Sequence, residues 1–150
     1  RLSRDVYEGR SLAALAVAAH ETGHAVQHQR GYVPLNIRNS LFPVASIGSQ
    51  LAFPLFFLGF LFAADVGYAL MTLGIYLFLA ALAFQLVTLP VEFDASSRAL
   101  QLLSAGGYLA QDERPGARAV LQAAALTYVA AVAVALLQVV RLLVLRNSRR

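Results

Sequence analysis

The composition of this 150-residue chain excludes an ordinary soluble domain. Hydrophobic residues make up 59% of the chain and charged residues only 13%, whereas soluble domains average about 45–50% and about 25%. The net charge is +4, but the basic residues are arginines at the ends of apolar segments, where they would meet lipid headgroups rather than nucleic acid. There is no cysteine, which excludes disulfides and thiolate metal sites. The composition predicts an all-α membrane protein.

Residues 1–10 form a polar lead-in, and the first predicted helix follows from Ser11 to Arg30. Ser11 is a favourable N-cap, and Gly31 is a favourable residue to end the helix in the left-handed conformation. The second half of this helix is too polar for a lipid-facing span. We therefore expect a buried helix in a domain apposed to the membrane.

This helix contains the pattern His-Glu-x-x-His at residues 20–24. Histidines four residues apart lie on one helix face, where they can share a Zn²⁺ ion, and Glu21 is placed to accept a proton from a water on that ion. The pattern also occurs by chance in helices. Here, however, the polar side chains interrupt an apolar run, where they would be costly without partners. The small residues Ala19 and Gly23 also allow another element to approach closely.

Three uncharged segments are each longer than the roughly 20 residues that cross a hydrocarbon core. They predict transmembrane helices over about 41–64, 66–89 and 117–145 within a single domain covering 1–150. Asp65 to Gly67 would be the turn that makes the first two spans a hairpin, and Pro43 and Pro54 predict a kink in the first span.

A further helix is predicted over residues 90–105, opened or redirected at Pro90 and ended by Gly106-Gly107. Glu92 lies where the second span leaves the membrane. A hairpin would return Glu92 to the side of the membrane on which His20 and His24 lie. This topology makes Glu92 the candidate third zinc ligand, packed on a second helix against the first.

Taken together, these features resemble the YugP-type membrane zinc metallopeptidases, and more distantly the HtpX-like and CAAX-prenyl-type membrane peptidases. The resemblance rests on residues 12–29, on the segment Leu89 to Ser96, and on residues 126–131. It implies a gluzincin-like site with His20, His24 and Glu92 as zinc ligands and Glu21 as general base. It also implies additional N-terminal sequence, including a further membrane helix.

Two kinds of group could support the zinc ligands. The distant relatives commonly have an aspartate four residues after the ligand glutamate, whereas this chain has Ser96 there and Asp94 two residues after Glu92. Either Asp94 or a backbone carbonyl could then hold a zinc-bound histidine in place. Asp94 could equally be a favourable charge at a helix N-terminus.

Three residues are candidates to stabilise the oxyanion, namely His28, Arg98 and Tyr108. His28 continues the histidine stripe, but His20 and His28 are about 12 Å apart along a helix, so a supporting or interfacial role is expected rather than metal ligation. Asp65 is expected to be a solvated turn residue. An aspartate as third ligand would change that interpretation, but no accompanying motif supports it.

The sequence therefore predicts a membrane-integral zinc endopeptidase that hydrolyses protein or peptide substrates near the bilayer surface. The alternative is a non-enzymatic membrane scaffold or regulator with a structural zinc site, against which Glu21 argues because such a site needs no base. The expected location is a plasma membrane of the bacterial type. By the positive-inside rule, five arginines favour an active site on the cytoplasmic side, namely Arg30, Arg38, Arg98, Arg114 and Arg118. Three arginines near the C-terminus argue for the reverse orientation of the last span, namely Arg146, Arg149 and Arg150.

Overall fold

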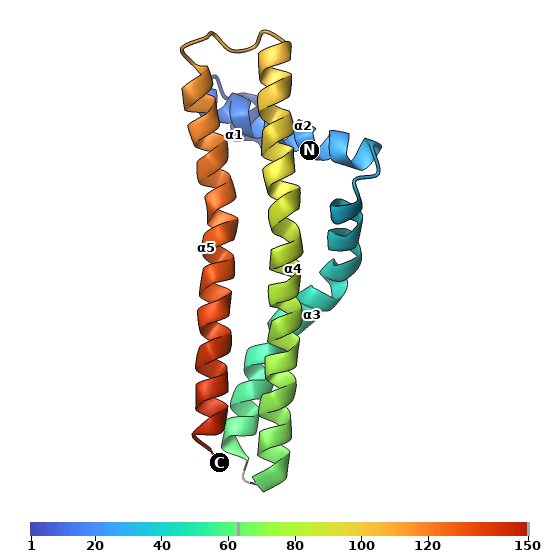
Figure 1. Cartoon of the computed structure of the whole chain (residues 1–150), viewed down its shortest axis with the longest axis vertical. Coiled ribbons are helices and arrows are strands. Elements are labelled where there is room, and N and C mark those ends of the chain that lie inside the picture. Colours follow the sequence, from blue (N-terminus) through green and yellow to red (C-terminus); the bar gives the residue numbers. More distant parts are fainter. Residues whose placement is uncertain (63, 150) are drawn as a thin grey trace. The chain divides into compact units, whose positions relative to one another are not determined.

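The computed structural model describes residues 1–62 and 64–149, and every regular element among them is a helix (Figure 1). The helices are α1 (Arg4–Tyr7), α2 (Leu12–Gln29), α3 (Val33–Leu61), α4 (Ala64–Ala105) and α5 (Arg114–Asn147). The all-α fold class is therefore confirmed.

Helix α2 begins and ends where the local signals predict. The Ser11 side chain accepts a hydrogen bond from the backbone N–H of Ala14 at 3.1 Å, which satisfies one of the free donors of the first turn. At the other end Gly31 has a φ of +60°, and the N–H of Tyr32 donates to the carbonyl of Gln27 at 3.0 Å. These are the contacts of a Schellman ending.

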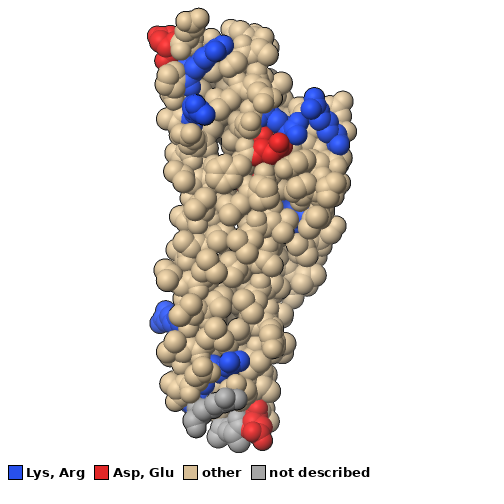
Figure 2. Space-filling model, viewed as in Figure 1, with Lys and Arg blue, Asp and Glu red and all other residues tan. Residues whose placement is uncertain are grey.

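The three long helices are the candidate membrane spans, over Val33–Leu61, Asp65–Ala105 and Arg114–Asn147. Only 28%, 28% and 22% of the most apolar window of each is buried within the chain, so most of their apolar surface needs another apolar environment. Figure 2 shows a wide surface over these helices without Lys, Arg, Asp or Glu. The chain is accordingly a membrane-associated helical protein.

Two features of the spans differ from the sequence-based prediction. Helix α4 continues through Pro90 instead of breaking there, and Asp65 to Gly67 lie in its first turn rather than in a connecting turn. Proline removes one backbone hydrogen bond and crowds the preceding turn, but the apolar and small residues on both sides of Pro90 favour helix, and no glycine follows until Gly106. One helix therefore serves as a candidate span and also carries Glu92.

The chain divides into two compact units. The first unit, which contains all the candidate site residues, comprises Arg1–Asn36 and Thr88–Val129, and the second comprises Ile37–Val87 and Ala130–Arg150. In the first unit α2 crosses the neighbouring segments of α4 and α5 (Figure 1). Small residues dominate the core of this unit, which contains Ala16, Ala19, Ala99, Leu103, Leu109, Ala117 and Leu121.

The second unit has a core of larger side chains. Phe56 of α3, Met71 and Ile75 of α4 and Leu142 of α5 pack together there, and all four are buried. Both Pro43 and Pro54 lie within α3, which is bent as the prolines predict (Figure 1).

Candidate metal centre

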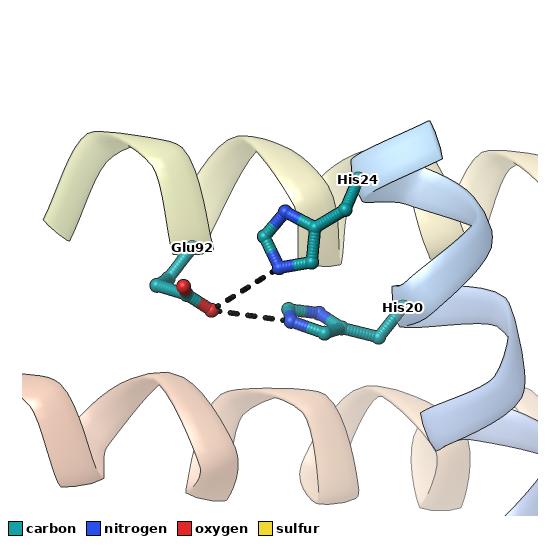
Figure 3. Close-up of side chains that lie close together, drawn as sticks. All are labelled: His20, His24 and Glu92. Atoms are coloured by element: carbon teal, nitrogen blue, oxygen red, sulfur yellow. Dashed lines mark hydrogen bonds and ion pairs between the residues drawn. The ribbon is translucent and has the colours of Figure 1, made fainter. Parts of the chain in front are cut away.

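Two histidines of α2 and one glutamate of α4 meet in the first unit (Figure 3). Oε2 of Glu92 lies 3.2 Å from Nε2 of His20 and 3.5 Å from Nε2 of His24. One ligand atom from each of the three residues can be chosen so that all three atoms lie within 4.8 Å of one another. Donors bound at about 2.0–2.1 Å to a tetrahedral zinc ion stand roughly 3.3 Å apart, so this donor set fits the metal.

The close approach of α2 to α4 depends on Gly23. A Cβ at Gly23 would overlap the carbonyl oxygen of Ala95 and come within 3.1 Å of the carbonyl carbon, so only glycine allows this contact between two backbones. Gly23 lies between the two histidines, and Ala95 is one turn beyond Glu92. The crossing point therefore brings the glutamate to the histidines. The prediction that small residues permit such an approach is confirmed.

Gln27 connects His24 to α4. Its amide nitrogen donates to the backbone carbonyl of Val91 and to Oδ2 of Asp94, both at 2.8 Å. Its Oε1 lies 2.9 Å from Nδ1 of His24, the ring nitrogen that does not face Glu92. Gln27 is fully buried, and no motif in the sequence marks it as a site residue. The available signal was its spacing, because positions 20, 24 and 27 share one face of a helix.

Ser96 occupies the corresponding position beside His20. Its Oγ lies 3.2 Å from Nδ1 of His20, and the residue is buried. Serine therefore makes the ring contact at the position where the distant relatives commonly have aspartate. Asp94 is connected to His24 through Gln27, which contacts both residues.

The groups around His24 stabilise the protonated form of its ring. The pKa of His24 is raised above its ordinary value, chiefly because the protonated ring can donate to Glu92; Gln27 and the charge of Glu21 add to this, and burial opposes it. A raised histidine pKa means that the neighbouring groups favour the charged form of that ring. Glu21 itself is exposed, on the same helix as the two histidines.

The remaining predicted residues are not members of the three-residue donor cluster. Nε of Arg98 donates to Oδ2 of Asp94 at 2.6 Å, and the guanidinium lies over the ring of Tyr32, 5.8 Å from its centroid. His28 is exposed and is not part of the donor cluster found in the described chain. Tyr108 is 69% exposed and borders an apolar cavity of about 600 Å³ between α2 and the end of α4.

Two histidines and a glutamate that meet from two helices, with an acid between the histidines, form the donor arrangement typical of zinc metallopeptidases. In this chain the centre belongs to a helical protein with three candidate membrane spans. Residues 1–147 match the family model described as "Putative neutral zinc metallopeptidase". The chain belongs to this family, which confirms the resemblance and the expectation of zinc as the cofactor.

A curated relative agrees with this assignment. The chain is 50% identical over 150 residues to "Putative membrane protease YugP" of Bacillus subtilis (strain 168). The match covers 99% of this chain and 65% of the relative, so the chain spans about two thirds of the relative's length. No solved structure matches the chain.

Proposed function

We propose that the chain is the catalytic part of a membrane-integral zinc endopeptidase. In this proposal His20, His24 and Glu92 hold the ion, and Glu21 is the general base. The observation that carries the proposal is the convergence of three donor atoms from α2 and α4 within 4.8 Å. Zinc held there would polarise the carbonyl of the scissile peptide and acidify a water molecule.

Glu21 supplies the proton transfer in this proposal. Its carboxylate is exposed, so it is open to water and to a substrate, and its charge acts on His24. An ionised carboxylate can accept the proton of the attacking water and then deliver it to the leaving amine. A zinc site that served only structure would need a fourth protein ligand and no such base.

A variant series tests the assignment of roles on the full chain in detergent, with zinc content and cleavage of a generic peptide as readouts. We expect Glu21→Gln to retain zinc and to lose cleavage by roughly 10²–10⁴-fold, because only the base is removed. Glu92→Ala should lose both zinc and cleavage. The matched control is Glu113→Gln, an acidic residue outside the donor cluster.

The wild-type chain decides between the two candidate functions. A chain that binds no zinc would overturn the peptidase assignment. The other outcome is tight zinc binding without cleavage. If this also holds for a longer protein that covers the full length of the relative, it would favour the scaffold with a structural zinc site.

We further propose that the single domain spans the bilayer at about 41–64, 66–89 and 117–145, and that the centre acts on protein segments at the cytoplasmic surface. The five arginines at positions 30, 38, 98, 114 and 118 support this orientation. Because the chain has no cysteine, Gln29→Cys at an exposed position of α2 gives a single label site. A membrane-impermeant maleimide should label it in inverted vesicles and not in intact cells. The reverse pattern would place the site outside.

A further inference from the structure

The amide of Gln27 has only one orientation that its surroundings permit. Its nitrogen lies 2.8 Å from two groups that can only accept hydrogen bonds, the carbonyl of Val91 and the carboxylate of Asp94. A flipped amide would place its oxygen against both acceptors. The side chain is fully buried, where water cannot compensate for such a mismatch. The amide oxygen must therefore face His24.

This orientation fixes the proton on the His24 ring. Because the amide oxygen 2.9 Å from Nδ1 only accepts, Nδ1 must carry the hydrogen. In the neutral ring the lone pair is then on Nε2, which faces Glu92. A bare lone pair and a carboxylate oxygen 3.5 Å apart repel each other unless a cation lies between them. The tautomer that Gln27 selects is the one that a metal ion requires.

Asp94 and Arg98 hold Gln27 in this orientation. The same Oδ2 that accepts from Gln27 also accepts from Nε of Arg98 at 2.6 Å. An aspartate paired with a guanidinium presents only acceptor atoms to the amide. The Val91 carbonyl is the neighbour of Glu92 on α4, so the same amide ties the histidine helix to the glutamate helix.

We propose that Gln27 is a positioning residue that sets the tautomer of His24 for zinc, and that Asp94 and Arg98 set the orientation of Gln27. This inference rests on the zinc site of the proposed function. It predicts a series of hydrogen bonds, here called the relay, from Arg98 through Asp94 and Gln27 to His24. The His-Glu-x-x-His motif does not include Gln27, Asp94 or Arg98. Residues that orient a metal-bound histidine typically change metal affinity by about 10–100-fold when replaced.

The test measures zinc affinity by competition with a chromophoric chelator, using the full chain in detergent. Gln27→Met retains most of the side-chain volume and loses every hydrogen bond, so affinity should fall by about 10–100-fold. Gln29→Met, at an exposed glutamine two residues away, should leave affinity unchanged. Equal affinity of Gln27→Met and wild type would overturn the inference.

A spectroscopic readout separates this role from simple packing. Nitrogen-15 spectra of histidine-labelled chain, recorded at alkaline pH with and without zinc, report which ring nitrogen carries the proton. We expect a protonated Nδ1 for His24 in the wild type, and loss of that preference in metal-free Gln27→Met. A protonated Nε2 in the metal-free wild type, or an unchanged preference in metal-free Gln27→Met, would refute the assignment. A wild-type chain without zinc affinity would overturn the proposed function, while the metal-free spectra would still decide the tautomer.

A paired exchange covers the case in which Gln27→Met does not fold. Gln27→Glu keeps an acceptor for His24 but places a carboxylate against Asp94, so zinc affinity should fall. Adding Asp94→Asn to it provides a donor at that position, and the double variant should regain affinity relative to Gln27→Glu. A double variant that binds no better than Gln27→Glu would contradict the relay.

Discussion

The crossing of α2 over α4 at Gly23 predicts that one added methyl group disturbs the metal centre. In Gly23→Ala the new Cβ would overlap the backbone carbonyl of Ala95, and neither backbone can rotate away as a side chain could. The two helices must move apart at the point that brings Glu92 to His20 and His24. The distances of 3.2 and 3.5 Å between glutamate and histidines should therefore lengthen.

Two opposing terms set the change in the free energy of unfolding of Gly23→Ala. Alanine is favoured over glycine inside a helix by about 1 kcal/mol, whereas overpacking costs typically about 1–3 kcal/mol. Because the obstacle at Gly23 is backbone, we take about 2–3 kcal/mol from the upper part of that range. The net loss of stability is then about 1–2 kcal/mol, with zinc affinity reduced by roughly tenfold or more.

Ala25→Gly is the matched control, because Ala25 is exposed on the same helix and two residues away. It should cost about 1 kcal/mol through helix propensity alone and leave zinc affinity unchanged. The assay is thermal unfolding of metal-free chain in detergent, together with zinc competition. If Gly23→Ala instead gains stability and binds zinc like the wild type, the close crossing does not exist and the explanation of the site is wrong.

Two further predictions concern the metal centre. Ser96→Ala removes the group 3.2 Å from Nδ1 of His20, so zinc affinity should fall by about tenfold; the exposed neighbour in Ser97→Ala should show no change, and a matching fall there would indicate a general effect of the helix. Free zinc at about 1,000 times its dissociation constant should stabilise the folded chain by about 4 kcal/mol, measured as a rise in the thermal midpoint. Glu92→Ala should abolish that rise, and a persisting rise would mean that zinc binds elsewhere.

The parts of the site that depend on local signals could be predicted from the sequence. The bounds of α2 follow from an N-cap serine and a glycine that accepts a positive φ, and both effects act within a few residues. The histidine pair follows from helical spacing alone. Glu92 required one further step, the return of a hairpin to the same side of the membrane. Its distances to the histidines agree with that step.

The continuity of α4 could not be predicted because two local effects compete at Pro90. Proline disfavours the preceding turn, and the helix nevertheless continues to Ala105. Val91, Ala95, Ala99 and Leu103 follow one another at intervals of four residues and are all buried in the first unit. Their burial supports a helix at a position where the single residue argues for a break. A prediction from local sequence counts the effect of the proline but does not include this packing between helices.

Gln27 shows what the sequence lacks in principle. Helical spacing places it on the face of the histidines, but a buried glutamine could equally bond to water, to a substrate or to another helix. Its role depends on the two acceptors that meet its nitrogen, which α4 presents on either side of Glu92. Those acceptors are set by the register of α4 against α2, and that register depends on the contact of Gly23 with Ala95. The smallest residue of the His-Glu-x-x-His pattern thus helps to determine how the ring of His24 is held opposite Glu92.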